Sequence, residues 1–276
     1  MTGSQNWKSW FGAIGASNMK TLTLLLLSGA LPLLAAEPFT GTWKVNLADA
    51  KFSQKPDKIE LKNGTYSCLT CDPPVTAKAD GTDQPVTGHP SYDTENVKIV
   101  DDRTVQFTEK KAGKLVSQAK TTVSADGKTA TTEFTGYPAS GGKPVTGTVM
   151  QKRVGGAPAG MHAVSGSWVM DKAENISDNG LTVTYEQSAD GLKMTSPTGE
   201  HYDAKIDGKD YPYEGSPEAD KVSLKRIGAR GIEETVKRGG KVWSSAQMTV
   251  SADGKTIAIV AHGHDGRVNT FTANKQ

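Results

Sequence analysis

The sequence lacks an excess of charge of either sign. Its formal net charge is +2 over 276 residues, and Lys8 and Lys20 are the only charged residues among the first 36. The rest of the chain therefore holds 30 acidic residues and equally many basic ones. Proteins that bind nucleic acid or anionic membranes carry a basic patch or stripe. A neutral body of this kind argues against nucleic acid as a partner.

Catalytic and cofactor-binding motifs are also missing. The chain has no Gly-x-Ser-x-Gly elbow, phosphate-binding loop, His-Glu-x-x-His helix or EF-hand loop. We therefore assign no catalytic residue and no cofactor, and expect a protein that is not an enzyme. The alternative is an enzyme whose carboxylates come together only in the folded chain.

Histidines are few, and one pair has a spacing that metals can use. His262 and His264 flank a glycine, so on a strand both imidazoles would lie on one face. No third ligand can be named, and Asp265-Gly266 follows as a turn signal. We favour a polar strand end here and assign no metal.

Cysteine is scarce, with two residues in the whole chain. Cys68 and Cys71 are separated by Leu-Thr, and in an exported protein such a pair usually forms a disulfide. A redox pair is the alternative, but thioredoxin-type sites lie at a helix start in a βαβ unit, which this sequence does not predict. No His follows Cys71 to suggest haem attachment, and no second Cys or His pair suggests a zinc knuckle.

The sequence has no apolar run of the ~20 residues that a transmembrane helix needs. Residues 22–36 form an uncharged, leucine-rich stretch after Met19-Lys20, and it ends in Ala35-Ala36. This pattern predicts a signal peptide over residues 19–36, and hence a secreted protein of the periplasm or cell exterior without a stable membrane span. A permanent anchor is the alternative. Residues 1–18 are interpreted as a misassigned or extended N-terminus.

An internal repeat organises the remainder of the chain. Residues 122–129 read Thr-Val-Ser-Ala-Asp-Gly-Lys-Thr, and residues 249–256 are identical. The same shift aligns Asp80-Gly81 with Asp207-Gly208. We predict a duplication, with one repeat over residues 38–154, a Gly- and Ala-rich linker over 155–163, and a second repeat over 164–276.

Alternation of apolar and polar residues predicts strands throughout both repeats. In the second repeat, Leu181, Val183 and Tyr185 alternate with threonines, and Asp-Gly pairs stand between such runs. Period-two alternation indicates a strand with one buried face, and Asp-Gly suits tight hairpins. No segment has a convincing helical period. The fold class predicted is all-β, as two tandem antiparallel β-barrels.

The start of each repeat carries a short shared motif. Gly41-Thr-Trp43 and Gly166-Ser-Trp168 resemble the Gly-x-Trp signature on the first strand of lipocalins and their calycin relatives. The resemblance implies a barrel in which each Trp closes one end against a basic residue of the last strand. The matching residues would be Arg153 for Trp43 and Lys275 for Trp168. The tandem arrangement also resembles uncharacterised secreted bacterial proteins, which imply no function.

Two functions are consistent with these features. The first is a non-enzymatic protein that binds a small apolar ligand inside a barrel. Its contacts would come from inward-facing side chains, namely Tyr185, Leu224, Trp243, Met248 and Ile259. The alternative is a structural or interaction module of the cell envelope with filled barrels, in which exposed aromatics such as Tyr211 and Tyr213 contact an envelope protein. The sequence leaves the oligomeric state open.

Overall fold

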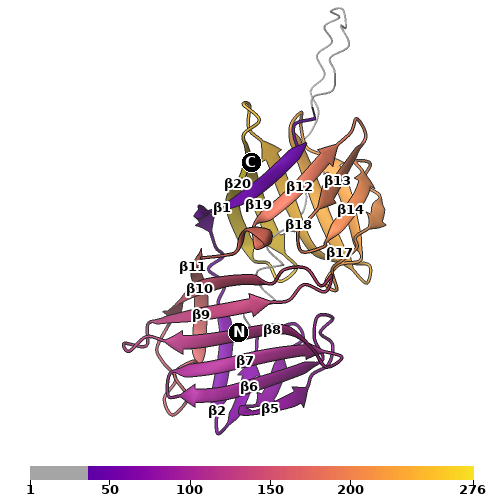
Figure 1. Ribbon diagram of the computed structural model, residues 1–276. Coiled ribbons are helices and arrows are strands. Elements are labelled where there is room, and N and C mark those ends of the chain that lie inside the picture. The colour runs from indigo at the N-terminus through magenta and orange to yellow at the C-terminus, as the bar shows by residue number, and fades with distance from the viewer. Residues whose placement is uncertain (1–36) are drawn as a thin grey trace, which may run out of the picture.

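The computed structural model describes residues 37–276, which form two antiparallel β-barrels, one above the other in Figure 1. Within these residues the chain has twenty strands and a single 3-10 turn, η2 (Asp178–Gly180). The all-β prediction of two tandem barrels is therefore confirmed. The signal peptide predicted over residues 19–36, and residues 1–18, lie outside the described residues.

Barrel 1 is one ten-stranded sheet with the order β4-β3-β2-β11-β10-β9-β8-β7-β6-β5. Its edge strands β4 and β5 lie against each other and nearly close the barrel. The strands are β2 (Asp57–Lys62), β3 (Thr65–Cys68), β4 (Val75–Lys78), β5 (Asp80–Pro85), β6 (Thr94–Asp101), β7 (Thr104–Lys111), β8 (Lys114–Val123), β9 (Thr129–Gly136), β10 (Val145–Val154) and β11 (Gly166–Glu174).

Barrel 2 is the second ten-stranded sheet, with the order β14-β13-β12-β1-β20-β19-β18-β17-β16-β15. A bridge between His201 and Glu214, with backbone hydrogen bonds of 3.0 and 2.9 Å, brings its two edges together. The strands are β1 (Gly41–Lys51), β12 (Thr182–Gln187), β13 (Gly191–Thr195), β14 (His201–Lys205), β15 (Asp210–Pro212), β16 (Lys221–Arg226), β17 (Gly231–Arg238), β18 (Lys241–Val250), β19 (Thr256–Gly263) and β20 (Val268–Lys275).

The two barrels exchange their first strands. β1 lies between β12 and β20, where the indigo strand runs among the orange and yellow strands of Figure 1. β11 lies reciprocally between β2 and β10. The barrels therefore do not coincide with the predicted repeats 38–154 and 164–276. The internal repeat shows which segments of the chain are similar. It does not show which sheet a strand joins, because two similar strands can each pair into either of two similar sheets.

The exchange also changes the partners of the two motif tryptophans. Arg153 lies 4.1 Å from the centroid of the Trp168 ring, and Lys275 Nζ lies 5.3 Å from that of Trp43. The expected pairs, Trp43 with Arg153 and Trp168 with Lys275, are therefore reversed, because each Trp has entered the other barrel and lies there opposite the last strand of the other repeat, β20 or β10. Both cation–π contacts cover a fully buried indole.

The identical octapeptides fold into identical turns. Ser124 Oγ donates to Asp126 Oδ1 at 2.6 Å, and Ser251 Oγ donates to Asp253 Oδ1 at 2.5 Å. The glycine that follows each Asp has a positive φ, 69° at Gly127 and 72° at Gly254. That region of conformational space is open to glycine at no steric cost, so the sequence dictates this hairpin in both halves.

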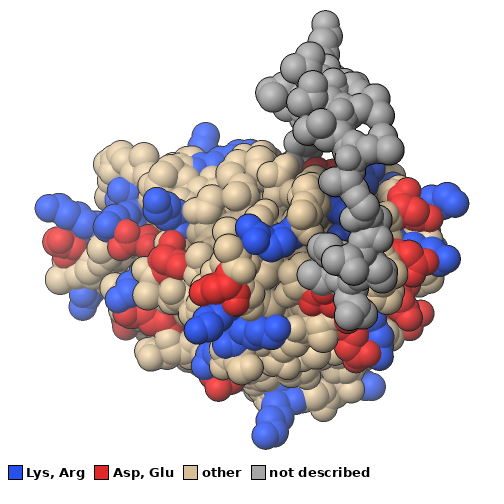
Figure 2. All heavy atoms as spheres, turned by 90° about the horizontal axis from the view of Figure 1, so that it is seen from above, with Lys and Arg blue, Asp and Glu red and all other residues tan. Residues whose placement is uncertain are grey.

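Each barrel has its own apolar core on the inward face of its strands. In barrel 2, Leu224, Ile232 and Ile257 are essentially inaccessible to solvent. In barrel 1, Leu61 and Val97 are equally buried. Burying such a side chain contributes roughly 1.5–3 kcal/mol. The alternation that puts these residues inside also sends polar side chains to water, and acidic and basic residues intermingle over the coloured part of the face in Figure 2.

Candidate functional site

A cavity of about 260 Å³ lies at the junction of the barrels and is lined by side chains of both. Barrel 1 contributes Thr132, Val149, Gln151 and Met170. Barrel 2 contributes apolar residues from its own strands, together with polar residues of the turn after β19. These are Val183, Tyr185, Met194, Val236, Trp243, His264, Asp265 and Arg267. The cavity therefore exists only because the two barrels are docked.

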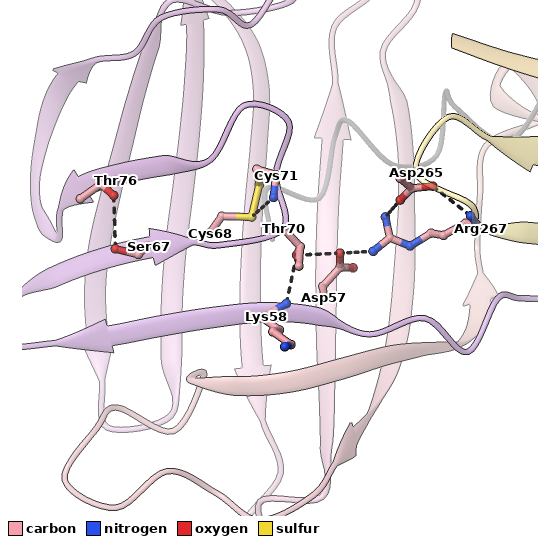
Figure 3. Close-up of a disulfide and its surroundings, with 9 residues drawn as sticks. All are labelled: Asp57, Lys58, Ser67, Cys68, Thr70, Cys71, Thr76, Asp265 and Arg267. Atoms are coloured by element: carbon pink, nitrogen blue, oxygen red, sulfur yellow. Dashed lines mark hydrogen bonds and ion pairs between the residues drawn. A yellow bond between two sulfur atoms is a disulfide. The ribbon is translucent and has the colours of Figure 1, made fainter. Parts of the chain in front are cut away.

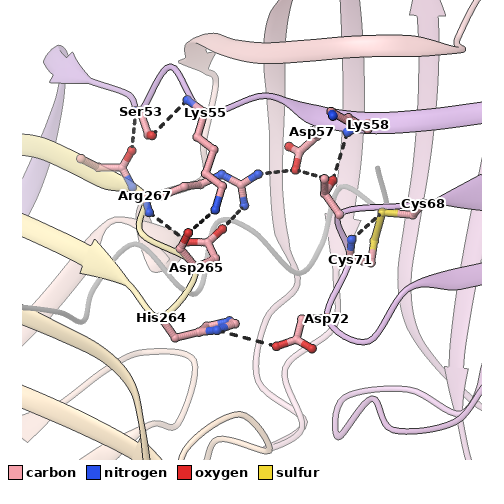
Figure 4. A network of polar contacts seen from close by, with 12 residues as sticks. Ser53, Lys55, Asp57, Lys58, Cys68, Cys71, Asp72, His264, Asp265 and Arg267 are labelled. Atoms are coloured by element: carbon pink, nitrogen blue, oxygen red, sulfur yellow. Dashed lines mark hydrogen bonds and ion pairs between the residues drawn. A yellow bond between two sulfur atoms is a disulfide. The ribbon is translucent and has the colours of Figure 1, made fainter.

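One wall of the cavity is an ion-pair network that joins the barrels. Arg267 of barrel 2 lies between Asp57 of barrel 1 and Asp265 of its own turn, with N–O distances of 2.5 Å to each (Figure 4). Lys55, in the segment that crosses between barrels, donates to the Asp265 carbonyl. Arg267 and Asp57 are 18% and 14% exposed, so solvent screens this pair less than a surface pair.

The predicted disulfide between Cys68 and Cys71 is present and forms part of the same wall. It closes the turn after β3, as Figure 3 shows. Within that turn Thr70 Oγ1 donates to Asp57 Oδ1 at 3.2 Å and accepts from the Lys58 amide at 3.0 Å. The disulfide therefore holds the turn that positions Asp57 for Arg267.

The other wall is built around Trp243. The His264 ring stacks on the indole at 3.9 Å between centroids, and the Arg238 guanidinium carbon lies 3.4 Å from the indole centroid. Two groups this close to one centroid must occupy opposite faces of the indole. Arg238 pairs with Glu218 at 2.6 Å, and His264 Nδ1 lies 3.7 Å from Asp72 Oδ2. Asp72 belongs to barrel 1, so this stack also bridges the junction.

The cavity reaches a buried carboxylate inside barrel 2. Glu234 is 5% exposed, lines the cavity and accepts a hydrogen bond of 2.6 Å from the Tyr202 hydroxyl. Burial raises the pKa of Glu234 to about 7, and the Tyr202 hydrogen bond opposes this shift by stabilising the anion. At neutral pH both the protonated and the ionised form of the Glu234 carboxyl are therefore populated.

Barrel 1 holds a second set of buried acids. Glu95 and Glu109 lie directly opposite each other on β6 and β7, and both are almost fully buried. Burial and the neighbouring Glu109 raise the pKa of Glu95 well above its usual range. Among residues 37–276, neither carboxylate oxygen of Glu95 nor the Tyr92 hydroxyl has a hydrogen-bond partner.

These buried acids were missed in the sequence, although a signal for them exists. Ile232 and Val236 alternate about Glu234, and Phe107 stands two residues before Glu109. On a strand, residues two apart share a face, so an acid in an apolar series is placed inside. An acid among apolar residues on the inward face marks a candidate site, because burying an unpaired charge has an unfavourable free energy.

The structure separates the five predicted ligand contacts into two groups. Tyr185 and Trp243 line the cavity. Leu224, Met248 and Ile259 do not line it but pack within the barrel 2 core, where Met248 Sδ accepts from the Tyr185 hydroxyl at 3.5 Å. An inward position alone does not distinguish a cavity wall from a filled part of the barrel.

The structure also places the tyrosines and histidines that the sequence raised as alternatives. Tyr211 and Tyr213 are partly buried against the barrel 2 core, so they do not form an exposed aromatic surface. His264 is stacked on Trp243 rather than joined with His262 in a ligand set. Over residues 37–276, no group of three or more His, Cys, Asp or Glu residues is arranged to hold a metal ion.

Comparisons with known proteins add no functional assignment. No protein-family model matches the chain, and no curated protein is significantly similar to it. Within residues 37–276, none of the helical structure is long and apolar enough to cross a membrane. The molecule is thus defined by its fold, as a protein of two β-barrels with strand exchange, and by the cavity at their junction.

Proposed function

We propose that this protein is an exported, non-enzymatic binding protein that holds a small, largely apolar ligand in the junction cavity. The observation that carries the proposal is the cavity itself, since ligand sites occur preferentially at domain interfaces and in the mouths of β-barrels. An apolar cavity of about 150 Å³ already admits benzene. The volume here therefore suits a ligand somewhat larger than a single aromatic ring.

The lining supports an apolar body with adaptable contacts. Val149, Val183 and Val236 offer aliphatic surface, and Met170 and Met194 add flexible, polarizable side chains from opposite barrels. Trp243 stands at the wall with one face on His264 and the other on Arg238. These groups would contact a ligand mainly through dispersion and the removal of apolar surface from water.

The barrel architecture supports kinship with lipocalins only in outline. Each motif tryptophan is covered by a basic residue of the last strand of one repeat, Arg153 on β10 or Lys275 on β20, which resembles the arrangement in that family. Each barrel has ten strands, however, where lipocalins have eight. The Cys68–Cys71 disulfide favours export, because disulfides persist in oxidising compartments.

Binding can be tested with 1-hexanol followed by ligand-observed NMR. Ala219 lines the cavity from a loop of barrel 2 and is partly exposed, so A219W should fill space without disrupting a strand. Ala125 lies exposed in a hairpin turn away from the cavity, and A125W is the matched control. We expect saturable binding to wild type and A125W and its loss in A219W. Equal signals from all three proteins would overturn the proposal.

Native mass spectrometry of protein purified gently from its own host provides a second test. A co-purifying small molecule that A219W fails to retain would support the proposal and identify the ligand class. Export is tested by cell fractionation followed by N-terminal sequencing of the mature chain. Recovery of the full-length chain in the cytoplasm would contradict the exported location.

A further inference from the structure

Glu234 is a buried carboxylate for which the protein provides little compensation. The described residues give its side chain one hydrogen bond, from Tyr202, and no cationic partner. Transferring an ionised carboxylate out of water is strongly unfavourable unless it is paired and hydrogen-bonded. An apolar side chain of similar size would fill this position with a more favourable free energy of burial. We therefore expect the carboxylate to pair with a group that the described residues do not provide.

Aromatic rings surround this carboxylate. Tyr185 and Tyr213 line the cavity with it, and Tyr202 donates to it from behind. The Tyr202 and Tyr213 rings lie 5.9 Å apart. Among residues 37–276 the Tyr185 hydroxyl donates to a methionine sulfur, and its oxygen lone pairs can accept from a donor in the cavity. Tyrosine faces also attract cations through the ring quadrupole.

The charges along the cavity favour the same kind of ligand. The lining acids outnumber the lining bases even though Arg238, outside the lining, pairs with Glu218: the acids are Asp57, Asp72, Glu200, Glu218, Glu234 and Asp265, and the bases are Lys55 and Arg267. Arg267 is held between two of these acids, and Lys55 donates to a backbone carbonyl. A cavity with an excess of carboxylates raises the local concentration of cations and disfavours anions.

We propose that the ligand of the junction cavity is a small organic cation with an apolar body, such as a primary alkylammonium, whose ammonium group pairs with Glu234. The ammonium would donate to the Glu234 carboxylate and to the Tyr185 oxygen, and the alkyl body would lie along Met194 and Val236 towards barrel 1. This inference rests on the proposed binding function and specifies the chemical class of its ligand.

The test compares three six-carbon probes that differ in charge, namely n-hexylammonium, 1-hexanol and hexanoate. We expect hexylammonium to bind at least about tenfold more tightly than 1-hexanol, since a charge-assisted hydrogen bond is roughly twice as strong as a neutral one. Hexanoate should bind most weakly. Glu234→Gln keeps the shape of the side chain and should remove the preference for the cation while leaving the affinity for 1-hexanol in place.

Glu133→Gln serves as the matched control, because Glu133 is 62% exposed on β9 of barrel 1 and does not line the cavity. It should bind all three probes as wild type does, and circular dichroism should show both variants folded. Equal or tighter binding of 1-hexanol or hexanoate, blocked by A219W, would overturn the inference and leave the binding function standing. Failure of all three probes to bind would overturn both.

Discussion

The Lys275 ammonium lies 5.3 Å from the centroid of the Trp43 ring, although the two residues stand near opposite ends of the described chain. The contact exists because β1 is inserted between β20 and β12, and the register places Trp43 directly opposite Lys275. The first strand of the described residues therefore completes the barrel formed by their last strands. Trp168 and Arg153 repeat the arrangement in barrel 1.

The exchange of strands predicts which barrel each motif tryptophan stabilises. Trp43→Ala should destabilise barrel 2 by about 3–5 kcal/mol, the usual loss for a buried tryptophan replaced by alanine. Hydrogen exchange read by mass spectrometry should show faster exchange in β12 and β20, on either side of β1, with little change in β2 and β10. Trp168→Ala is the reciprocal control and should affect β2 and β10. Faster exchange in β2 after Trp43→Ala would contradict the exchanged topology.

The Asp57–Arg267 pair predicts coupling between the barrels. Arg267→Gln leaves the partly buried Asp57 without its cation, and we expect a loss of about 2 kcal/mol in the free energy of unfolding. Asp57→Asn leaves Arg267 with Asp265 alone and should cost less. In the double variant the losses should not add, because both changes remove one interaction. Additive losses in chemical denaturation would show that the pair does not act across the junction.

The raised pKa of Glu234 predicts that the free energy of unfolding falls as pH rises. Its pKa is about 7 in the folded chain against 4.5 for the ordinary side chain, so folding favours the protonated form. The stabilisation is fully present below pH 4.5 and is lost as pH rises through 7. At about 1.4 kcal/mol per pKa unit the change is about 3 kcal/mol.

Urea unfolding at pH 5 and pH 8 measures this effect. Wild type should lose more stability over that interval than Glu234→Gln, because the amide does not titrate. Glu95 in barrel 1 has a raised pKa in the same direction and remains in both proteins, so the difference between wild type and variant isolates Glu234. Parallel pH profiles for the two proteins would contradict the assignment.

Removing the disulfide should loosen the turn that it closes without unfolding the barrels. It closes a turn of only a few residues, for which the loop-entropy estimate is about 2 kcal/mol. Replacing both Cys68 and Cys71 by Ser should leave the barrels folded, lower the melting temperature and speed amide exchange at Lys58, whose amide donates to Thr70. Unchanged exchange at Lys58 would show that the turn is held by other contacts.

The strands, the turns and the presence of two similar halves all follow from the order of the amino acids. Strands follow from alternating residues such as Val222 and Leu224, and turns follow from the glycine after each Asp of the repeated octapeptide. Both features depend on neighbours in the chain. The disulfide was also predictable, because Cys68 and Cys71 are close in sequence and no other cysteine competes.

The barrel that each first strand joins, and the place of the cavity, depend instead on contacts between distant parts of the chain. β1 and β11 carry equivalent motifs, so either could complete either sheet, and in the folded protein segments 52–56 and 175–181 carry the chain from one barrel to the other. The cavity is bounded by side chains more than a hundred residues apart, such as Asp57 and Arg267. Periodicity reports which face of a strand is inward, whereas an open cavity depends on how two complete barrels dock.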